Sequence, residues 1–162
     1  MIESFLQDAL PSGISGFRIL DVGCGNGMIS QYFSKNNDVT GVDIVDQRRK
    51  DMQSFNFIQV HSAQLPFEDA SFDIVISHHV IEHVPDQKAH LSELHRVLKM
   101  EGLGYLGTPN KSSPVMEGHV GNDLVLQYSQ MVPLMQSQGF KTQLISLRLA
   151  SRPDRYYGDI RF

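Results

Sequence analysis

The stretch Leu20-Asp-Val-Gly-Cys-Gly-Asn-Gly27 decides the fold of this chain. It follows a short apolar run at residues 18–22 and precedes residues 28–33, whose apolar side chains recur at helical spacing. Glycines in a turn between a strand and a helix let bare backbone approach a ligand at the N-terminus of the helix. The order of strand, glycine turn and helix therefore predicts a nucleotide-binding turn at one edge of a parallel sheet.

The rest of the chain continues this alternation of short β-branched runs and helical segments. Further strands are expected at residues 39–43, 57–60, 72–77, 103–107 and 141–147, and residues 155–162 are compatible with a seventh. A helix is expected at residues 87–99, stopped by Glu101-Gly102, and residues 46–52 form at most a short helix. A last helix is expected to be capped by Ser129 and to reach Gln138, with Pro133 in or near its first turn. The pattern predicts a three-layer α/β/α fold with a doubly wound, mostly parallel sheet of six or seven strands.

The composition is that of one ordinary globular domain. The chain has 162 residues, of which 41% are hydrophobic and 20% are charged, so we expect a single domain over residues 1–162. Lys and Arg number 14 against 18 Asp and Glu, which is the opposite of the basic excess that neutralises a phosphate backbone. We therefore expect no nucleic-acid partner.

Cysteine content and apolar runs bear on the cellular compartment. Cys24 is the only cysteine, which excludes an internal disulfide framework and a four-cysteine zinc site and favours a reducing compartment. No apolar run approaches the roughly 20 residues that span a bilayer. Residues 1–10 lack the basic residues of a signal peptide, and residues 2, 5, 6, 9 and 10 fit one face of a short helix instead. We expect a cytoplasmic protein without an integral membrane segment, either a monomer or a homodimer.

The spacing of the glycines fits a dinucleotide site poorly. The dinucleotide fingerprint is Gly-x-Gly-x-x-Gly, but Met28 stands at the third glycine when counting from Gly23, and Ser30 stands there when counting from Gly25. The sequence reads Asp-x-Gly-x-Gly-x-Gly instead. Asp43 ends the next strand, where a carboxylate can accept hydrogen bonds from both hydroxyls of one ribose.

Further segments complete a resemblance to a known family. They are LPFEDASFD at residues 65–73, VIEHVPD at 80–86, RVLK at 96–99 and GTPN at 107–110. With the glycine turn, and in this order, they make residues 17–147 resemble the class I S-adenosylmethionine-dependent methyltransferases, particularly the small-molecule branch related to ubiquinone and menaquinone biosynthesis enzymes. The resemblance implies a Rossmann-like methyltransferase fold, S-adenosylmethionine as cofactor, S-adenosylhomocysteine as product and a small-molecule substrate.

The resemblance also assigns roles to individual residues. The residues implied to bind the cofactor are Asp21, Gly23, Gly25, Gly27, Asp43, Ala63, Ser77 and His78. The glycine turn with Asp21 would cradle the methionine part, and Asp43 would bind the ribose. Ala63 would offer its backbone to the adenine ring, next to Ser62, which replaces the acid that the family often has. Ser77 and His78 would lie along the methionine part.

Two histidines are candidates for a general base. Methyl transfer from a sulfonium is an in-line displacement that mainly requires alignment and exclusion of water. A hydroxyl acceptor is helped by a base, for which histidine is the natural residue. His79 follows a strand and His119 belongs to the long loop at residues 108–123, so both are placed to face the acceptor. His90 and His95 are expected to be surface or groove residues of the helix at 87–99.

The run His79-Val-Ile-Glu82-His83 matches an inverted zinc-peptidase motif, H-x-x-E-H. That motif requires both histidines on one face of a long helix, whereas Pro85 disfavours helical geometry at Val84. We therefore expect no metal site. Hydrogen bonds that hold the loop are the simpler interpretation of Glu82 and His83, and a magnesium-type role for Glu82 stays open.

Three functions are compatible with these observations. The leading one is methyl transfer from S-adenosylmethionine to a small molecule, with O-methylation slightly favoured over carbon or nitrogen. A non-catalytic S-adenosylmethionine-binding protein or subunit is the alternative, because the chain is short for the family. A nicotinamide-dependent oxidoreductase is disfavoured by the glycine spacing.

Overall fold

The structure is a computed structural model that describes residues 6, 8, 10, 12–109, 124, 126–148 and 156–161. Its strands are β1 (Arg18–Val22), β2 (Asp38–Asp43), β3 (Asn56–Gln59), β4 (Phe72–His78), β5 (Leu98–Pro109), β6 (Gln143–Arg148) and β7 (Tyr156–Arg161). They form a sheet in the order β3-β2-β1-β4-β5-β7-β6. Neighbours from β3 to β5 pair in parallel, whereas β7 pairs antiparallel with both β5 and β6. The mostly parallel sheet predicted from the sequence is confirmed, and the tail supplies the seventh strand.

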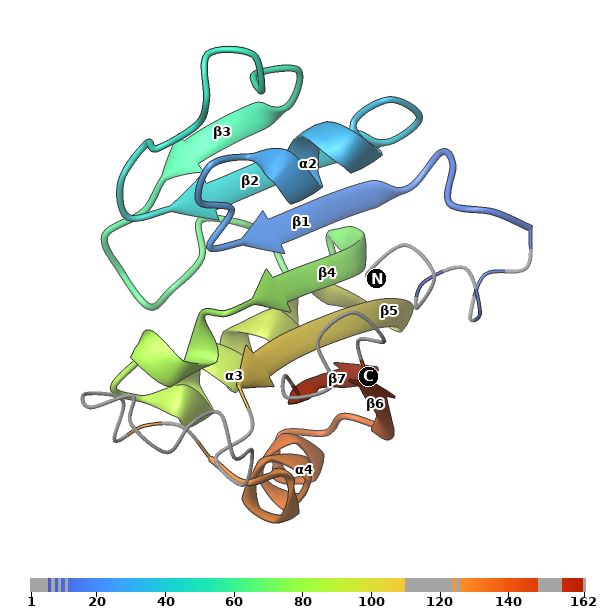
Figure 1. Ribbon diagram of the computed structural model, residues 1–162, viewed down its shortest axis with the longest axis vertical. Coiled ribbons are helices and arrows are strands. Elements are labelled where there is room, and N and C mark those ends of the chain that lie inside the picture. The colour runs from blue at the N-terminus through green and yellow to red at the C-terminus, as the bar shows by residue number, and fades with distance from the viewer. Residues whose placement is uncertain are drawn as a thin grey trace.

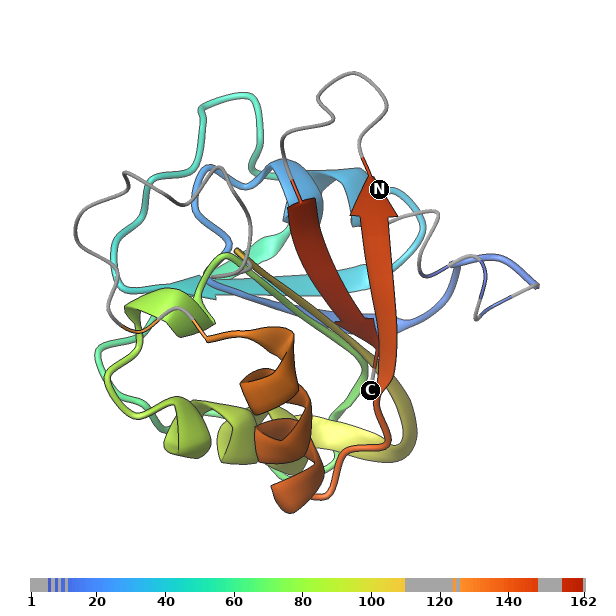
Figure 2. The same ribbon diagram turned by 60° about the horizontal axis from the view of Figure 1, so that its bottom comes forward.

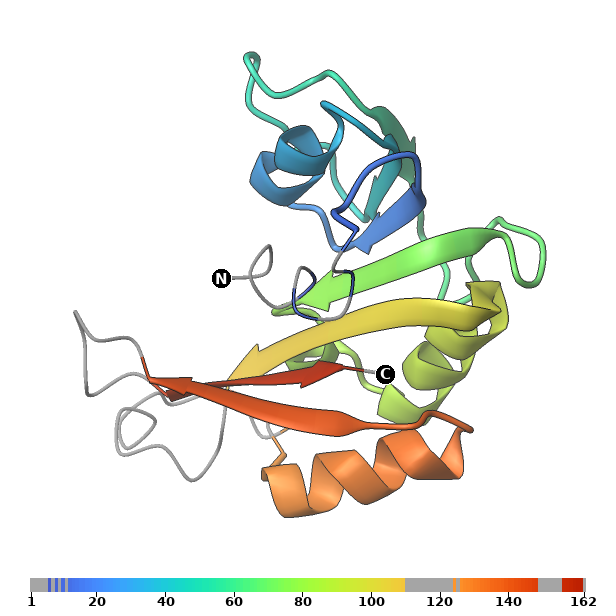
Figure 3. The same ribbon diagram turned by 90° about the vertical axis from the view of Figure 1, so that its right-hand side faces the viewer.

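Helices cover both faces of this sheet. They are α2 (Met28–Phe33), α3 (Gln87–Val97), α4 (Tyr128–Ser137) and the short 3-10 helix η1 (Ile81–His83). In Figure 1, α2 lies over β1 and β2 on the face toward the viewer. Figure 2 and Figure 3 show α3 and α4 together on the opposite face. This is the three-layer α/β/α arrangement that the alternating sequence pattern predicts.

Two apolar clusters, one on each face of the sheet, hold the layers together. Successive residues of β1 alternate between them, since Leu20 and Val22 pack with α3 and α4 while Ile19 packs on the α2 side. Leu94 of α3 is fully buried in the first cluster and Leu6 in the second. Residues 2, 5 and 9 of the expected N-terminal helix lie outside the described residues. β1 is thus buried on both faces directly before the glycine turn.

The end of α3 differs from the sequence prediction. The helix stops at Val97, before the expected residue 99, and β5 already begins at Leu98. Leu98 has the extended angles φ −77° and ψ 136°, and it pairs with Phe72 of β4. A shift in register between Phe72 and Ile74 accommodates this early pairing. Pairing with a strand distant in sequence therefore ends the helix before Glu101-Gly102 can do so.

The start of α4 also differs. Its N-cap is Gln127 and not Ser129, and the Gln127 side chain forms a capping box with Gln130. Pro133 lies inside the helix rather than in its first turn. Because proline has no N–H, α4 lacks the hydrogen bond that residue 133 would otherwise donate to the carbonyl of Ser129. The prediction was wrong because glutamine is not among the strongly preferred N-cap residues, whereas serine is.

Residues 46–52 form no helix. Two short-range ion pairs organise the segment instead, Arg48 with Asp46 at 2.8 Å and Arg49 with Asp51 at 2.9 Å. The Arg48 guanidinium carbon also lies 4.5 Å from the ring centroid of Phe57 in the edge strand β3. The arginine covers an aromatic ring that a longer crossover helix would otherwise shield.

The parallel strands bring three loops to one edge of the sheet. β1, β2 and β4 all end on the left in Figure 1, where the glycine turn and η1 follow them. The chain order of the strands reverses between β1 and β4. Ligands of open parallel sheets bind at the carboxyl ends of the strands beside such a reversal. The fold therefore places a ligand site between the glycine turn and the loop after β4.

Candidate cofactor site

The glycine turn is built from backbone that side chains would obstruct. Gly23 has φ +74°, and a Cβ atom there would collide with the side chain of Val80. Gly25 has φ +51°, and no heavy atom lies within 4 Å of the position that its Cβ would take. Gly27 is the N-cap residue of α2. The turn is thus tightly packed on the Gly23 side and open on the Gly25 side, where a ligand can approach the main chain.

The Asp43 carboxylate closes the turn from the end of β2. Its Oδ2 accepts a hydrogen bond from the Gly25 N–H at 2.8 Å, and its Oδ1 accepts one from the Ile44 N–H at 2.7 Å. Each carboxylate oxygen has two acceptor positions, so these backbone bonds leave one on each oxygen. Asp43 is therefore held in place by the backbone while it keeps acceptor capacity for two further donors.

Asp21 is a buried carboxylate behind the turn. The residue is 1% exposed, and its Oδ2 accepts a hydrogen bond from the Ser30 hydroxyl at 2.7 Å. Among the described residues, Oδ1 has no hydrogen-bond partner. Burial raises the pKa of Asp21 to about 6, against the opposing effect of its hydrogen bonds with Ser30, and the nearby charge of Asp43 adds to the increase. A cationic ligand group would relieve this desolvated carboxylate.

A cavity of about 610 Å³ opens between the turn and the loops that follow β3 and β4. This volume is ordinary for a small-molecule site. The cavity is lined by Val22, Gly23, Gly25, Val42, Asp43, Ile44, Val60, His61, Ser62, Ala63, Leu65, His79, Val80, His83, Val84, Pro85 and His90. Of the cofactor residues proposed from the sequence, the structure brings Gly23, Gly25, Asp43 and Ala63 together here. The others are not among its lining residues; they are Asp21, Gly27, Ser77 and His78.

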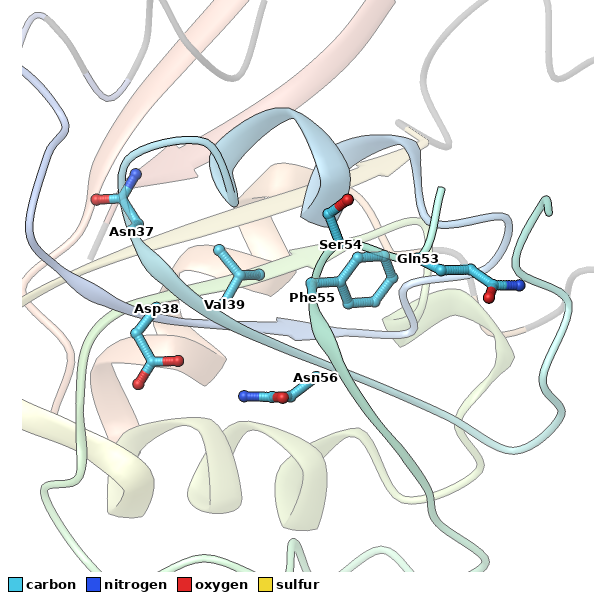
Figure 4. A pocket seen from close by; sticks show the side chains of 7 residues that line it. All are labelled: Asn37, Asp38, Val39, Gln53, Ser54, Phe55 and Asn56. Atoms are coloured by element: carbon cyan, nitrogen blue, oxygen red, sulfur yellow. The ribbon is translucent and has the colours of Figure 1, made fainter. Parts of the chain in front are cut away.

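A smaller cavity of about 270 Å³ lies at the opposite, amino-terminal end of β2 and β3. Figure 4 shows its lining side chains, which come from the start of the two strands and from the segment before β3. They are Asn37, Asp38, Val39, Gln53, Ser54, Phe55 and Asn56. None of the residues proposed from the sequence lies in this cavity.

The sequence analysis predicted His90 to be a surface or groove residue and did not propose it for the site. His90 is only 8% exposed, and its Nε2 lies 3.2 Å from the Ser77 hydroxyl in the floor of the large cavity. Burial lowers its pKa to about 4, so the ring is neutral at pH 7. The signal was present in the spacing, because His90, Leu94 and Val97 share one helical stripe.

His78 lies beside Tyr105 on the α2 side of the sheet. The two ring centroids are 5.8 Å apart, and the centroids of His78 and His79 are 4.3 Å apart. Among the described residues, the buried Nδ1 atom of His78 has no hydrogen-bond partner. Burial and the neighbouring His79 lower the pKa of His78 to about 4. The strand end therefore presents a neutral imidazole and not a cation.

His79 and Glu82 form a close pair at the start of η1. The Nδ1 atom of His79 lies 3.0 Å from Oε1 of Glu82, whose other oxygen accepts a hydrogen bond from the Thr108 hydroxyl at 3.3 Å. Glu82 is 2% exposed, and burial raises its pKa, but the bond from His79 and other local interactions outweigh burial and leave the pKa below its usual value. His119, the second candidate base, lies outside the described residues.

The described residues contain neither a metal-binding cluster nor a membrane-spanning helix. No group of three or more His, Cys, Asp or Glu residues among them is arranged to hold a metal ion. No helix formed by them has the length and hydropathy needed to cross a membrane.

The family is decided by a match to residues 20–106, more than half of the chain, with a model described as a methyltransferase domain. The match begins in β1, includes the glycine turn and ends in β5. The chain belongs to the class I S-adenosylmethionine-dependent methyltransferases.

Curated relatives of this methyltransferase include enzymes whose names refer to quinone biosynthesis. Ubiquinone biosynthesis O-methyltransferase of Pseudomonas aeruginosa is 28% identical over a 127-residue alignment that covers 72% of this chain and 55% of that protein. Demethylmenaquinone methyltransferase of Staphylococcus saprophyticus is 34% identical over a 115-residue alignment that covers 64% of this chain and 49% of that protein. The chain thus spans about half the length of these curated relatives.

Solved structures agree with the methyltransferase fold. A Burkholderia thailandensis 1,6-didemethyltoxoflavin-N1-methyltransferase, solved with S-adenosylhomocysteine, matches with a TM-score of 0.77 at 19% identity over 98% of this chain and 74% of that one. The [4+2]-cyclase SpnF matches with a TM-score of 0.77 at 16% identity over 99% of this chain and 78% of that one. At such identities the likeness concerns the fold alone.

The residues of the cavity fit the cofactor of the family. S-adenosylmethionine carries a ribose with two hydroxyls, and Asp43 keeps one acceptor position on each carboxylate oxygen. It also carries an ammonium group, for which the unpartnered Oδ1 of Asp21 is the nearest suitable carboxylate of the turn, buried directly behind it and outside the cavity lining. The open side of Gly25 admits a ligand to the main chain of the turn. The two carboxylate acceptors and the open side of the turn therefore suit the hydroxyl and ammonium groups of S-adenosylmethionine.

Proposed function

We propose that this protein transfers a methyl group from S-adenosylmethionine to a hydroxyl group of a small molecule. The observation that carries the proposal is that Asp43 and His79 line one cavity, the first as a ribose acceptor and the second as a candidate base. The names of two relatives, both from quinone biosynthesis, favour an aromatic acceptor. In this proposal, residues 1–162 act as one methyltransferase domain, and the formal charge of −4 favours a small molecule over nucleic acid. The cytoplasmic location stays a prediction.

The chain's own residues divide the work of cofactor binding. Asp43 would accept the ribose hydroxyls, Asp21 would pair with the ammonium group, and Ala63 would offer its backbone to the adenine ring. Gly25 lets the cofactor approach without a side chain between it and the turn. The cofactor supplies a methyl group on a positively charged sulfur, which is a good leaving group. The protein mainly has to hold an acceptor oxygen in line and exclude water.

Ser77 and His78 would act from behind the site. Ser77 is fully buried and bonded to His90, and His78 is neutral, so neither places a positive charge near the sulfonium. Their proposed role is to shape the wall beside the methionine part. His79 is the proposed base because it is both ionisable and exposed to the cavity.

The first test of the proposed function is ligand-dependent thermal unfolding. A ligand at about 100 times its dissociation constant adds roughly 2.7 kcal/mol of stability, which raises the Tm of a domain this size by several degrees. We expect this increase with S-adenosylmethionine and S-adenosylhomocysteine and none with NAD. A shift with NAD alone would contradict the proposal.

Turnover is the second test. The protein is mixed with methyl-labelled S-adenosylmethionine and either 3,4-dihydroxybenzoate, an oxygen acceptor, or menadiol, a carbon acceptor. Label in the catechol supports the proposal. Label on the ring carbon of menadiol alone would replace O-methylation by C-methylation, whereas label on a menadiol hydroxyl is still O-methylation. Cofactor binding without turnover of either acceptor favours the non-catalytic alternative. The match with SpnF, a protein named as a cyclase, shows that the methyltransferase fold also occurs in a protein named for another reaction.

A further inference from the structure

We propose that Glu82 is a positioning residue that fixes the tautomer and direction of the His79 ring, so that Nε2 of His79 is the atom that takes the acceptor's proton. This inference rests on the proposed function, because it assigns the base that O-methylation requires.

The first observation is a buried carboxylate aimed at the histidine. Glu82 is 2% exposed, and Oε1 lies 3.0 Å from Nδ1 of His79 while Oε2 accepts the Thr108 hydroxyl. An ionised carboxylate can only accept hydrogen bonds, so Nδ1 of His79 must carry the proton. In a neutral ring the lone pair then belongs to Nε2. The carboxylate therefore selects which nitrogen is basic.

The second observation is the backbone of His79 itself. Its φ is +58°, in the left-handed region that residues other than glycine rarely adopt. The His79 N–H donates to the carbonyl of Gly107 at 2.8 Å, and the His83 N–H donates to the carbonyl of Val80 at 2.8 Å. Strained residues of this kind persist where the surroundings hold them, and they are concentrated at functional sites. Backbone bonds to β5 and within η1 thus hold His79 at the cavity.

The third observation is the contrast with the neighbouring histidines. His79 lines the cavity with 35% of its side chain exposed, while His90 and His78 are neutral rings whose pKa values are lowered by burial. Groups of the described residues that face the pair include His78 on β4, His83 on η1 and Thr108 on β5. Glu82 bonds to His79 and to no other histidine in the described residues. His61 and His83 also line the cavity, so the bond to Glu82 is what distinguishes His79 from the other histidines there.

The proposed step balances as follows in atoms and charge. The acceptor O–H bond breaks and its proton moves to Nε2 of His79, while an electron pair of the oxygen forms the bond to the methyl carbon. The electron pair of the broken carbon–sulfur bond remains on the sulfur, which leaves as a neutral thioether. His79 is then positively charged beside the Glu82 carboxylate, and it returns the proton to solvent.

The decisive experiment compares two catechol acceptors at pH 8 in the full chain. One is 3,4-dihydroxybenzoate, whose hydroxyls are mostly protonated at this pH, and the other is 4-nitrocatechol, whose hydroxyl para to the nitro group is already ionised and needs no base. We expect Glu82→Gln to lower kcat for the first by about 10- to 100-fold and for the second by less than threefold. His79→Asn should do the same, because asparagine tolerates the left-handed conformation. Glu101→Gln makes the same chemical change at an exposed carboxylate and should leave both rates unchanged.

The outcomes separate this inference from the proposed function. Equal losses on both acceptors in Glu82→Gln would mean that Glu82 only supports the loop, and this would overturn the inference. If the unmodified protein binds S-adenosylhomocysteine but methylates neither catechol, the proposed function fails, and nitrogen-15 NMR of the histidine rings decides about Glu82. The inference requires a protonated Nδ1 on His79 at pH 8 and a mixture of tautomers in Glu82→Gln. A protonated Nε2 in the unmodified protein would exclude it, and His79→Asn assigns the signal.

Discussion

The glycine turn after β1 and the loop after β4 face the same cavity but are built in opposite ways. The turn presents main chain, and its residue Gly25 leaves open space where a side chain would stand. The loop presents side chains, among which His79 and Glu82 are joined by a hydrogen bond. The two meet where Val80 fills the space beside Gly23. A ligand can therefore be gripped by backbone on one side and acted on by side chains on the other.

This difference predicts that the turn is sensitive to any added side chain. Gly23→Ala combines an unfavourable φ with a collision against Val80, so we expect S-adenosylhomocysteine affinity to fall at least about 100-fold and stability to fall by roughly 2–4 kcal/mol. Calorimetric titration and urea unfolding measure the two effects. The matched control is Gly16→Ala, because Gly16 has φ +79° with no atom within 4 Å of a Cβ.

Gly16→Ala should lose only about 1–2 kcal/mol of stability, the cost of the unfavourable backbone conformation, and should keep its affinity for S-adenosylhomocysteine. Adding Val80→Ala to Gly23→Ala should restore part of the stability. If the double variant is no more stable than Gly23→Ala, the contact between turn and loop is not the cause of the loss.

The second prediction concerns the carboxylate that joins β2 to the turn. Asp43→Ala removes both the ribose acceptor and the bond to the Gly25 N–H, so affinity for S-adenosylhomocysteine should fall about 30-fold or more. Circular dichroism should show an intact fold. Asp46→Ala removes an exposed carboxylate nearby that pairs with Arg48 and should keep full affinity. Undiminished binding in Asp43→Ala would remove Asp43 from the site.

The third prediction uses pH to probe the floor of the cavity below the loop. His90 has a pKa of about 4 in the folded protein against an ordinary value of 6.5, so the unfolded chain binds more protons between these values. Its contribution to stability is present above pH 6.5 and is lost as the pH falls toward 4. When the pH falls from 7 to 4.5, the free energy of unfolding of His90→Gln should therefore decrease by about 2 kcal/mol less than that of the unmodified protein. Equal losses in urea unfolding would contradict the burial of this ring.

The fourth prediction concerns Asp21 on the turn side, where the sign is reversed. Its pKa of about 6 lies above the ordinary 3.8, so the folded state binds the extra proton. The contribution of Asp21 to the stability of the folded state is fully present below pH 3.8 and is lost as the pH rises through 6. Between pH 4.5 and 7 the unmodified protein should lose about 1–2 kcal/mol of unfolding free energy through Asp21, and Asp21→Asn should not show this loss. Asp38→Asn, at an exposed site, is the control and should keep it. Urea unfolding at the two pH values measures this difference. If Asp21→Asn keeps the pH dependence of the unmodified protein, the prediction is wrong.

The same contrast explains what could be read from the sequence. β1, the glycine turn and the end of β2 follow from short apolar runs and glycine punctuation, and these signals are local. The bond of Glu82 to Thr108 joins residues 26 positions apart, and nothing in the spacing of H-x-x-E-H announces it. The early end of α3 likewise depends on pairing between Leu98 and Phe72. Local backbone features were readable, whereas contacts between elements distant in sequence required the fold.

Two roles were missed in the sequence for different reasons. His90 lay on a readable apolar stripe, but histidine is seldom buried without a partner, and its partner Ser77 belongs to another element. The predicted N-cap of α4 was wrong because Gln127 caps the helix through reciprocal hydrogen bonds with Gln130, although glutamine alone has no strong preference for the N-cap position.

The place of β7 in the sheet has a consequence for how the chain is made. β6 precedes β7 in sequence, yet in the sheet it pairs only with β7, which lies between β6 and β5. On the ribosome, β6 therefore emerges before the strand that connects it to the rest of the sheet exists. At synthesis rates of about 5–20 residues per second, this unpaired interval lasts on the order of a second. A chain truncated before Tyr156 would lose two strands, since β6 would have no partner to join.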